Sequence, residues 1–228
     1  MAEVIVALDF TSADEAMSMV DLLGTAGDFY KVGLELYTRA GPEFVRSLTR
    51  TGRRVFLDLK LHDIPNTVAG AVSAAADLEV ELLTVHCSGG RAMMEAAVDA
   101  ATGRLDVVGV TVLTSLAPEE IEAVWGKSRV EMGDEVLRLG ALASEAGLSG
   151  VVASGSEVAR LKFELGPDFK VVTPGIRPAG SDVGDQARVV TPAAAVASGS
   201  DYLVVGRPVT KAEDPVAALR SIREEATP

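Results

Sequence analysis

Short apolar runs alternate with longer amphipathic segments along the whole chain. The runs are rich in Val, Ile and Leu, which is typical of strands in a parallel sheet that is covered on both faces. Each run is followed by a segment in which apolar residues recur at helical spacing. The predicted strands are residues 4–9, 29–34, 55–60, 82–87, 107–113, 150–154, 170–174 and 202–206.

The segments between the strands carry signals for helix starts. Thr11 or Ser12 can cap a helix over residues 13–23, whose first turn is acidic, and Pro42 is placed to begin the next helix. Further helices are predicted at residues 67–76, 90–101, near 118, 133–146, 156–165, 192–198 and 215–225. Eight strand-then-helix units without a linker predict an α/β protein, a (β/α)₈ TIM barrel that forms a single domain over residues 1–228.

An open doubly wound sheet is the alternative architecture for this pattern. Such a sheet usually carries a glycine-rich phosphate-binding turn after its first strand. Here the first strand ends in Asp9-Phe10-Thr11, which contains no glycine. The sequence therefore favours the closed barrel.

Polar and glycine residues gather where the predicted strands end. In a (β/α)₈ barrel, the carboxyl ends of the strands meet at the mouth that carries the chemistry. These positions are therefore candidates for a functional site. They are Asp9, Lys31, Asp58, Lys60, His86, Thr114, Ser115, Pro174, Gly175, Arg177, Gly206 and Arg207.

Side-chain alternation indicates where the charges of the third strand point. Phe56, Asp58 and Lys60 share one face, and the opposite face is entirely aliphatic and must meet the helices. Asp58 and Lys60 are therefore expected to face the barrel mouth, and the same alternation directs Lys31 inward. A structural ion pair is the alternative, but buried ion pairs contribute little to stability, which favours a functional site.

A phosphate-binding region is predicted after the last two strands. The segment VTPGIRPAGSDVGDQ (172–186) is long and glycine-rich, and the eighth strand ends in VVGRP (204–208). Barrels often bind phosphate between these two loops through backbone N–H groups. Arg177 and Arg207 are placed to add bidentate contacts, and Gly180 and Gly184 are placed as hinges of a lid.

The composition of the chain limits the kinds of molecule and cellular location that we expect for it. The formal net charge is −12 and the sequence pI is about 4.6, which argues against nucleic acid and anionic membrane surfaces but not against a small anionic substrate. No apolar run approaches the ~18 residues needed to span a bilayer. The chain has a single cysteine, Cys87, and its first residues lack a basic region. We therefore expect no signal peptide and a cytoplasmic location.

A metal site is not expected. The two histidines, His62 and His86, have no paired ligand spacing, and Cys87 has no neighbour that would activate its thiolate. We expect His86 and Cys87 to be core residues and His62 to be a packing or hydrogen-bonding residue.

The motifs together resemble the orotidine 5′-phosphate decarboxylase family, of the bacterial type, along the whole chain. The decapeptide DLKLHDIPNT (58–67) is highly specific, whereas its D-x-K-x-x-D core also occurs in sugar-phosphate decarboxylases and aldolase-like synthases on the same barrel. The other matching segments are IVALD (5–9), KVG (31–33), VHCSGG (85–90), VTVLTS (110–115), TPGIRPAGSD (173–182), DQ (185–186) and VVGRPVT (204–210).

The resemblance implies decarboxylation of orotidine 5′-monophosphate to UMP, the last step of de novo pyrimidine nucleotide biosynthesis, without metal or organic cofactor. It implies an alternating charged array of Lys31, Asp58, Lys60 and Asp63. Lys60 would protonate C6 as CO₂ leaves, and Asp58 would lie against the departing carboxylate. Asp63, with Ile64 and Thr67, would reach the partner's site across a homodimer interface.

The resemblance also implies roles for the remaining residues at the mouth. Asp9 and Lys31 would contact the ribose, and Thr114 and Ser115 would meet the pyrimidine edge. The phosphate and the closing loop would be served by Pro174, Arg177, Gln186, Gly206 and Arg207.

Two other functions fit parts of the sequence. A metal-dependent sugar-phosphate lyase on the same barrel would share the acidic and basic core, but the segment IPNT (64–67) disfavours it. A non-catalytic nucleotide-binding barrel would need no intact charged set, and the set Lys31, Asp58, Lys60 and Asp63 is complete.

Overall fold

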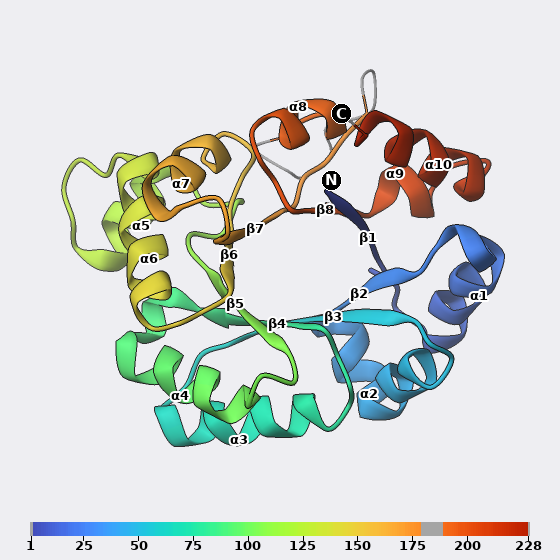
Figure 1. Ribbon diagram of the computed structural model, residues 1–228, viewed down its shortest axis with the longest axis horizontal. Coiled ribbons are helices and arrows are strands. Elements are labelled where there is room, and N and C mark those ends of the chain that lie inside the picture. Colours follow the sequence, from blue (N-terminus) through green and yellow to red (C-terminus); the bar gives the residue numbers. More distant parts are fainter. Residues whose placement is uncertain (1, 179–188, 228) are drawn as a thin grey trace.

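A closed barrel of parallel strands forms the centre of the computed structural model, which describes residues 2–178 and 189–227 (Figure 1). The strands pair in chain order, and β8 closes the barrel against β1. The predicted fold class is therefore confirmed, while the extent of a single domain over residues 1–228 stays a prediction. The strands are β1 (Glu3–Ala7), β2 (Phe29–Gly33), β3 (Arg54–Leu61), β4 (Leu82–His86), β5 (Asp106–Val110), β6 (Gly150–Val152), β7 (Lys170–Thr173) and β8 (Tyr202–Val205).

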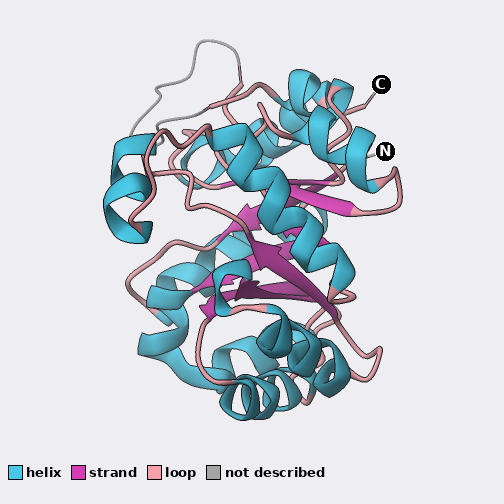
Figure 2. Cartoon of the chain, turned by 90° about the vertical axis from the view of Figure 1, so that its left-hand side faces the viewer, coloured by secondary structure: helices cyan, strands magenta, loops and turns pink. Residues whose placement is uncertain are grey.

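Helices surround the strands on the outside of the barrel (Figure 2). They connect each strand to the next, as expected for consecutive βα units, and they leave the carboxyl ends of the strands as one open face. The helices are α1 (Ala13–Leu23), α2 (Leu34–Thr49), α3 (Pro65–Ala76), α4 (Arg91–Ala101), α5 (Pro118–Trp125), α6 (Met132–Glu145), α7 (Val158–Leu165), α8 (Pro192–Ala197), α9 (Arg207–Thr210) and α10 (Pro215–Glu225).

One helix prediction is wrong at its start, and one short helix was missed. The second helix was expected to begin at Pro42, but α2 begins at Leu34 and passes through a kink at Gly41, whose φ is 67°. Glycine tolerates this left-handed backbone, and the helix continues from Pro42. The signal at Pro42 therefore indicates a helix start in the sequence, and the turns before Gly41 were missed. The short helix α9, which follows Gly206 directly, was not predicted at all.

Strand alternation divides the core into two apolar clusters. Residues that point outward from the barrel, such as Tyr30, Leu57 and Leu83, pack with the helices in the larger cluster. The inward residues form a smaller cluster inside the barrel, so the interior is a packed core rather than a pore. This inner cluster consists of Ile5, Ala7, Phe29, Phe56, Leu82, Val108, Val172, Tyr202 and Val204, with Val152 packed against it.

A layer of four charged residues closes the floor of the barrel below this apolar core. Glu3, Arg54, Asp106 and Lys170 are the first residues of β1, β3, β5 and β7, and each shares its strand face with a residue of the inner cluster. The odd-numbered strands thus supply this layer, and negative and positive side chains alternate around the barrel. Arg54 pairs with Glu3, and Lys170 pairs with Asp106, so the charges of the layer cancel.

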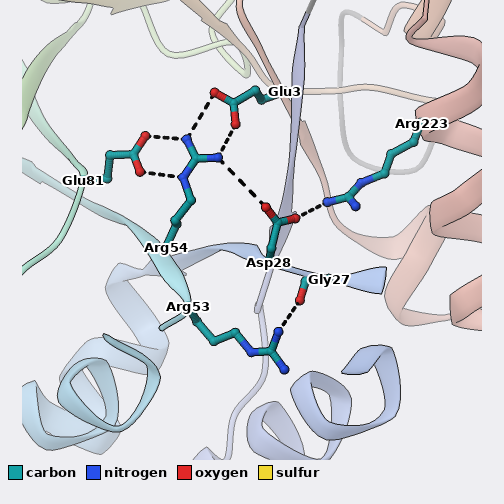
Figure 3. Close-up of polar contacts among 7 residues, drawn as sticks. All are labelled: Glu3, Gly27, Asp28, Arg53, Arg54, Glu81 and Arg223. Carbon is teal, nitrogen blue, oxygen red and sulfur yellow. Dashed lines mark hydrogen bonds and ion pairs between the residues drawn. The ribbon is translucent and has the colours of Figure 1, made fainter. Parts of the chain in front are cut away.

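Arg54 is the centre of the floor (Figure 3). Its guanidinium donates two hydrogen bonds to Glu81, of 2.6 and 2.5 Å, and two more to Glu3. It also lies 4.0 Å from Asp28, which pairs in turn with Arg223, and 4.2 Å from the centre of the Phe29 ring. The hydrogen bonds with Glu81 and Glu3 raise the pKa of Arg54 above its ordinary value. The guanidinium therefore links the starts of several strands.

Replacing Arg54 with alanine is expected to lower the free energy of unfolding by about 1–3 kcal/mol, because three carboxylates would lose their shared cation. The matched control is Arg39→Ala, which removes an exposed arginine paired with Glu35 on a helix surface and should cost at most ~0.5 kcal/mol. Urea denaturation monitored by circular dichroism measures both. Equal midpoints for the two variants would show that the floor cluster does not stabilise the barrel.

Candidate active site

A buried carboxylate lies between two lysines at the mouth of the barrel. Asp58, near the end of β3, accepts hydrogen bonds from the Lys60 ammonium at 2.9 Å through each of its oxygens. Lys31, on β2, approaches the same carboxylate to 3.6 Å. The Asp58 side chain is 13% exposed and that of Lys31 is 11% exposed, so both charges are held largely away from solvent.

Asp9 extends this arrangement on the other side of Lys31. Its Oδ1 atom accepts a hydrogen bond from Lys31 Nζ at 2.9 Å. Gly33 leaves room for the pair, because a Cβ atom there would lie 3.0 Å from Lys31 Nζ and 3.4 Å from Asp9 Oδ1. Four charges of alternating sign thus run along the wall in the order Asp9, Lys31, Asp58, Lys60. The charges sum to zero, which offsets the cost of burying Lys31 and Asp58, while the Asp9 side chain is 66% exposed.

The end of β3 is not a regular strand. Lys60 has φ of 52°, in the left-handed region that residues with a side chain seldom adopt, and the register between β3 and β4 shifts between Leu57 and Leu61. Strand alternation correctly predicted that Asp58 and Lys60 would lie together, but it assumed an extended backbone at Lys60. The Lys60 amide donates a 2.8 Å hydrogen bond to the side chain of Thr84 on β4.

The lysines control the ionisation of Asp58. Burial alone raises the pKa of this carboxyl group, but the charges of Lys31 and Lys60 and the hydrogen bonds from Lys60 and Thr84 oppose it. The net effect holds the pKa of Asp58 below its ordinary value. Asp58 is therefore ionised at neutral pH, between the two lysine side chains.

Two histidines and the single cysteine also belong to this end of the barrel. The His62 and His86 rings pack with centroids 5.4 Å apart, and burial, followed by the charges of His62 and Lys60, lowers the pKa of His86. Cys87 is fully buried, which raises the pKa of its thiol to about 12. Cys87 is thus the core residue that was predicted, and its thiol is un-ionised at neutral pH.

The array lines a cavity of about 580 Å³ at the carboxyl ends of the strands. This volume falls within the ~300–1,000 Å³ typical of small-molecule sites. The structure brings most of the predicted site residues to its wall: Asp9, Lys31, Asp58, Lys60, Thr114, Ser115, Pro174, Arg177, Gly206 and Arg207. Their individual roles stay predictions.

Three predicted site residues lie away from this cavity. Asp63, Ile64 and Thr67 belong to an exposed stretch between the end of β3 and the first turn of α3. The Asp63 carboxylate accepts a hydrogen bond from the Ile64 amide, and the Ile64 side chain is two-thirds exposed. Within one chain, Asp9 rather than Asp63 completes the alternating array. Gln186 and the predicted hinges Gly180 and Gly184 lie outside the described residues.

Some residues of the site were missed by the sequence argument. Thr84 contacts both Asp58 and Lys60, and Thr210 and Lys211 line the cavity beside Arg207. Two signals were available for them. Thr84 is a polar residue on the inward face of β4, between Leu82 and His86, and Lys211 follows Arg207 at a spacing of four residues, one helical turn.

The side chains on the cavity wall are suited to stabilising negative charge and donating a proton. Lys60 lines the cavity, and its ammonium pairs with the ionised Asp58 carboxylate at 2.9 Å. Such a group can stabilise negative charge that develops on a bound molecule and can donate a proton to it. Within residues 2–178 and 189–227, no group of three or more His, Cys, Asp or Glu side chains is arranged so that it could hold a metal ion. In the same ranges, no helix is long and apolar enough to cross a bilayer.

Comparison with known proteins identifies the family. Residues 2–222 match the model of the orotidine 5′-phosphate decarboxylase / HUMPS family. The chain belongs to this family. The orotidine 5′-phosphate decarboxylase of Vibrio parahaemolyticus is 49% identical over 226 residues, which cover 97% of this chain and 96% of that protein. That of Chromobacterium violaceum is 52% identical over 225 residues, covering 97% of this chain and 90% of the relative.

Solved structures of the family have the same fold. The crystal structure of orotidine 5′-phosphate decarboxylase from Lactobacillus acidophilus superposes with a TM-score of 0.89 at 38% identity, and each chain is covered completely. The enzyme from Pyrococcus horikoshii superposes with a TM-score of 0.79 at 25% identity, with 99% of each chain covered. The likeness to the family therefore extends over the entire barrel.

We predict that the pKa of Asp58 rises when Lys60 is replaced by methionine, because one ammonium and its hydrogen bonds are lost while burial remains. A carboxyl ¹³C NMR titration measures this pKa directly, and Arg39→Met serves as the control for a distant charge.

Because the folded-state pKa of Asp58 is depressed, its ionisation stabilises the wild-type protein above the unfolded-state pKa of ~3.9. That contribution is lost as the pH falls through the folded-state value. An unchanged Asp58 titration in the methionine variant would contradict the coupling.

Proposed function

We propose that this chain decarboxylates orotidine 5′-monophosphate to UMP in the cavity at the barrel mouth, as the final step of pyrimidine nucleotide synthesis. The observation that carries the proposal is the Lys60 ammonium, hydrogen-bonded to buried Asp58 on the wall of that cavity, in a chain of this family. Relatives about 50% identical over nearly the whole chain are named for this activity.

The proposed reaction breaks the bond between C6 of the pyrimidine and its carboxylate. The electron pair of that bond stays on C6, CO₂ leaves, and the Lys60 ammonium donates a proton to C6 to give UMP. Lys60 then regains a proton from solvent. Asp58 lies beneath Lys60 and is placed against the departing carboxylate. Lys31 keeps Asp58 ionised and, with Asp9, is placed to contact the ribose.

A single ammonium cannot supply all of the required stabilisation. Two unit charges about 4 Å apart at an effective dielectric constant of ~20 interact by about 4 kcal/mol, which corresponds to roughly a thousand-fold in rate. The remainder must come from preorganised charges, exclusion of water and binding energy from distant parts of the substrate. The fixed array supplies the first of these, because its charges need no reorganisation during the reaction.

The substrate phosphate is the proposed source of the distant binding energy. Arg177, Gly206 and Arg207 line the cavity from the ends of β7 and β8. Gly175, also on the wall, belongs to the base of the β7–α8 loop, which is tied together where Ile176 bridges Val190. We assign the phosphate to this side, together with Gln186 and Pro174, and the pyrimidine edge to Thr114 and Ser115.

Asp63, Ile64 and Thr67 are proposed to act across a homodimer interface. All three are exposed in the single chain and do not line the cavity. A two-fold arrangement would present this stretch of each chain to the other chain's site. Each active site would then contain Lys31, Asp58 and Lys60 of one protomer and an aspartate of its partner. The cytoplasmic location expected from the single cysteine also stays a prediction.

Purified wild-type protein is expected to consume orotidine 5′-monophosphate in the presence of EDTA, with the ultraviolet change that accompanies UMP formation. Lys60→Ala should lower kcat by a factor of ~10³ or more, because both the proton donor and the charge at C6 are lost. Arg39→Ala is the control for loss of a surface cation. Absence of turnover by folded wild-type protein would refute the proposed activity, and activity abolished by EDTA would favour a metal-dependent lyase.

Mixing two inactive variants tests the contribution of Asp63 across the interface. Lys60→Ala and Asp63→Ala proteins are each expected to be severely impaired. After unfolding and refolding as an equal mixture, half of the dimers contain one chain of each kind, and one of their two sites is intact. Activity of about a quarter of the wild-type value is then expected from random pairing. If Asp63 acted within its own chain, no site in the mixture would be complete and the mixture would stay inactive.

A further inference from the structure

Thr84 connects the two central groups of the array from a neighbouring strand. It lies in the middle of β4, and its side chain is completely buried. Its Oγ1 atom accepts a 2.8 Å hydrogen bond from the Lys60 amide and donates one of 3.0 Å to Asp58 Oδ1. The residue does not line the cavity, so it acts on bound molecules only through its neighbours.

The chemistry of the three groups determines the direction of both hydrogen bonds. An amide N–H can only donate and an ionised carboxylate can only accept, whereas a hydroxyl has one proton and two acceptor sites. The hydroxyl proton of Thr84 must therefore point at Asp58 while an oxygen lone pair faces Lys60. A side chain at this position has to accept and donate at once, and an aliphatic residue of the same shape does neither.

The backbone that Thr84 holds is strained. Lys60 has φ of 52°, and a residue with a side chain in the left-handed region is disfavoured by about 1–2 kcal/mol. The strain occurs where the β3–β4 register shifts, so the ordinary ladder between these strands does not continue through Lys60. The Lys60 amide instead donates its hydrogen bond to the Thr84 hydroxyl, which replaces a ladder hydrogen bond at the residue whose ammonium faces the cavity. Strain of this kind persists only where the surroundings impose it.

We propose that Thr84 is a positioning residue, whose hydroxyl holds the Lys60 backbone and the Asp58 carboxylate in the relative arrangement that the reaction requires. The inference rests on the proposed function, because the required arrangement is that of a proton donor above a carboxylate. Thr84 touches neither the cavity nor its contents, so it affects the rate of the chemical step rather than the affinity for substrate. Misplacement of a catalytic group by about 1 Å is enough to lower a rate by up to ~100-fold.

The test compares Thr84→Val, which keeps the shape and removes the hydroxyl, with Thr84→Ser, which keeps the hydroxyl. For Thr84→Val we expect kcat to fall ~10–100-fold while KM for orotidine 5′-monophosphate changes less than about threefold. Thr84→Ser should retain kcat within about threefold of wild type. Thr84→Ala is a second variant without the hydroxyl, for use if the valine protein does not fold, and should lose kcat to the same extent.

Ser200 offers a control. It also carries a buried hydroxyl, which is paired at 2.7 Å with that of Thr173, outside the array. Ser200→Ala should lower stability in thermal denaturation but leave kcat within about twofold of wild type. A wild-type kcat in folded Thr84→Val, or an equal loss in Thr84→Ser, would overturn the inference.

Crystal structures of the variants separate this inference from the proposed function. In Thr84→Val we expect Lys60 to leave the left-handed region and its Nζ atom to move away from Asp58, whereas Thr84→Ser keeps both. An unchanged Lys60 in the valine variant would overturn the positioning role whether or not the enzyme acts on orotidine 5′-monophosphate. If the wild-type protein is inactive but Lys60 is displaced in the Thr84→Val structure, only the proposed reaction is refuted and the positioning role stands.

Discussion

The carboxylate of Asp58 determines how the rest of the site can be built. A single charge buried in a barrel is costly, and here two ammonium groups and a hydroxyl offset the cost. The partners come from three consecutive strands: Lys31 from β2, Lys60 from β3 itself and Thr84 from β4. The carboxylate therefore meets all three partners only when these strands are correctly paired, so the electrostatics of the site depend on the folding of the barrel.

The same requirement explains why the backbone departs from regular geometry at one place. In a regular strand, Lys60 would share the ladder of β3 with its neighbours, and nothing would link its amide to the carboxylate beneath its side chain. Because the register shifts and Lys60 is left-handed, the Lys60 amide donates its hydrogen bond to the Thr84 hydroxyl instead. The strain at Lys60 and the buried hydroxyl of Thr84 thus occur together, at the point where the Lys60 ammonium meets the Asp58 carboxylate.

Much of the fold could be predicted because its determinants are local. The apolar runs predicted each strand near its observed position, and alternation within the third strand correctly placed Phe56 inside the barrel and Asp58 beside Lys60. Interactions between strands could not be predicted in the same way. The position of Thr84 against Asp58 depends on the register of β3 and β4, and the cluster around Arg54 joins residues from the starts of several strands. A residue that acts across an interface likewise leaves no signal within one chain, and among the described residues the Asp63 carboxylate accepts a hydrogen bond from the neighbouring Ile64 amide.

The barrel carries a charged layer at its floor and a charged array at its mouth, with apolar layers of Phe29, Phe56 and Val172 between them. The two sets share no side chain and are separated by the packed interior. Changes at the floor can accordingly adjust how much heat the protein withstands, while changes at the mouth adjust its chemistry. A chain of this design can be adapted to a warmer or a colder environment by substitutions at one end, with the reacting groups at the other left as they are.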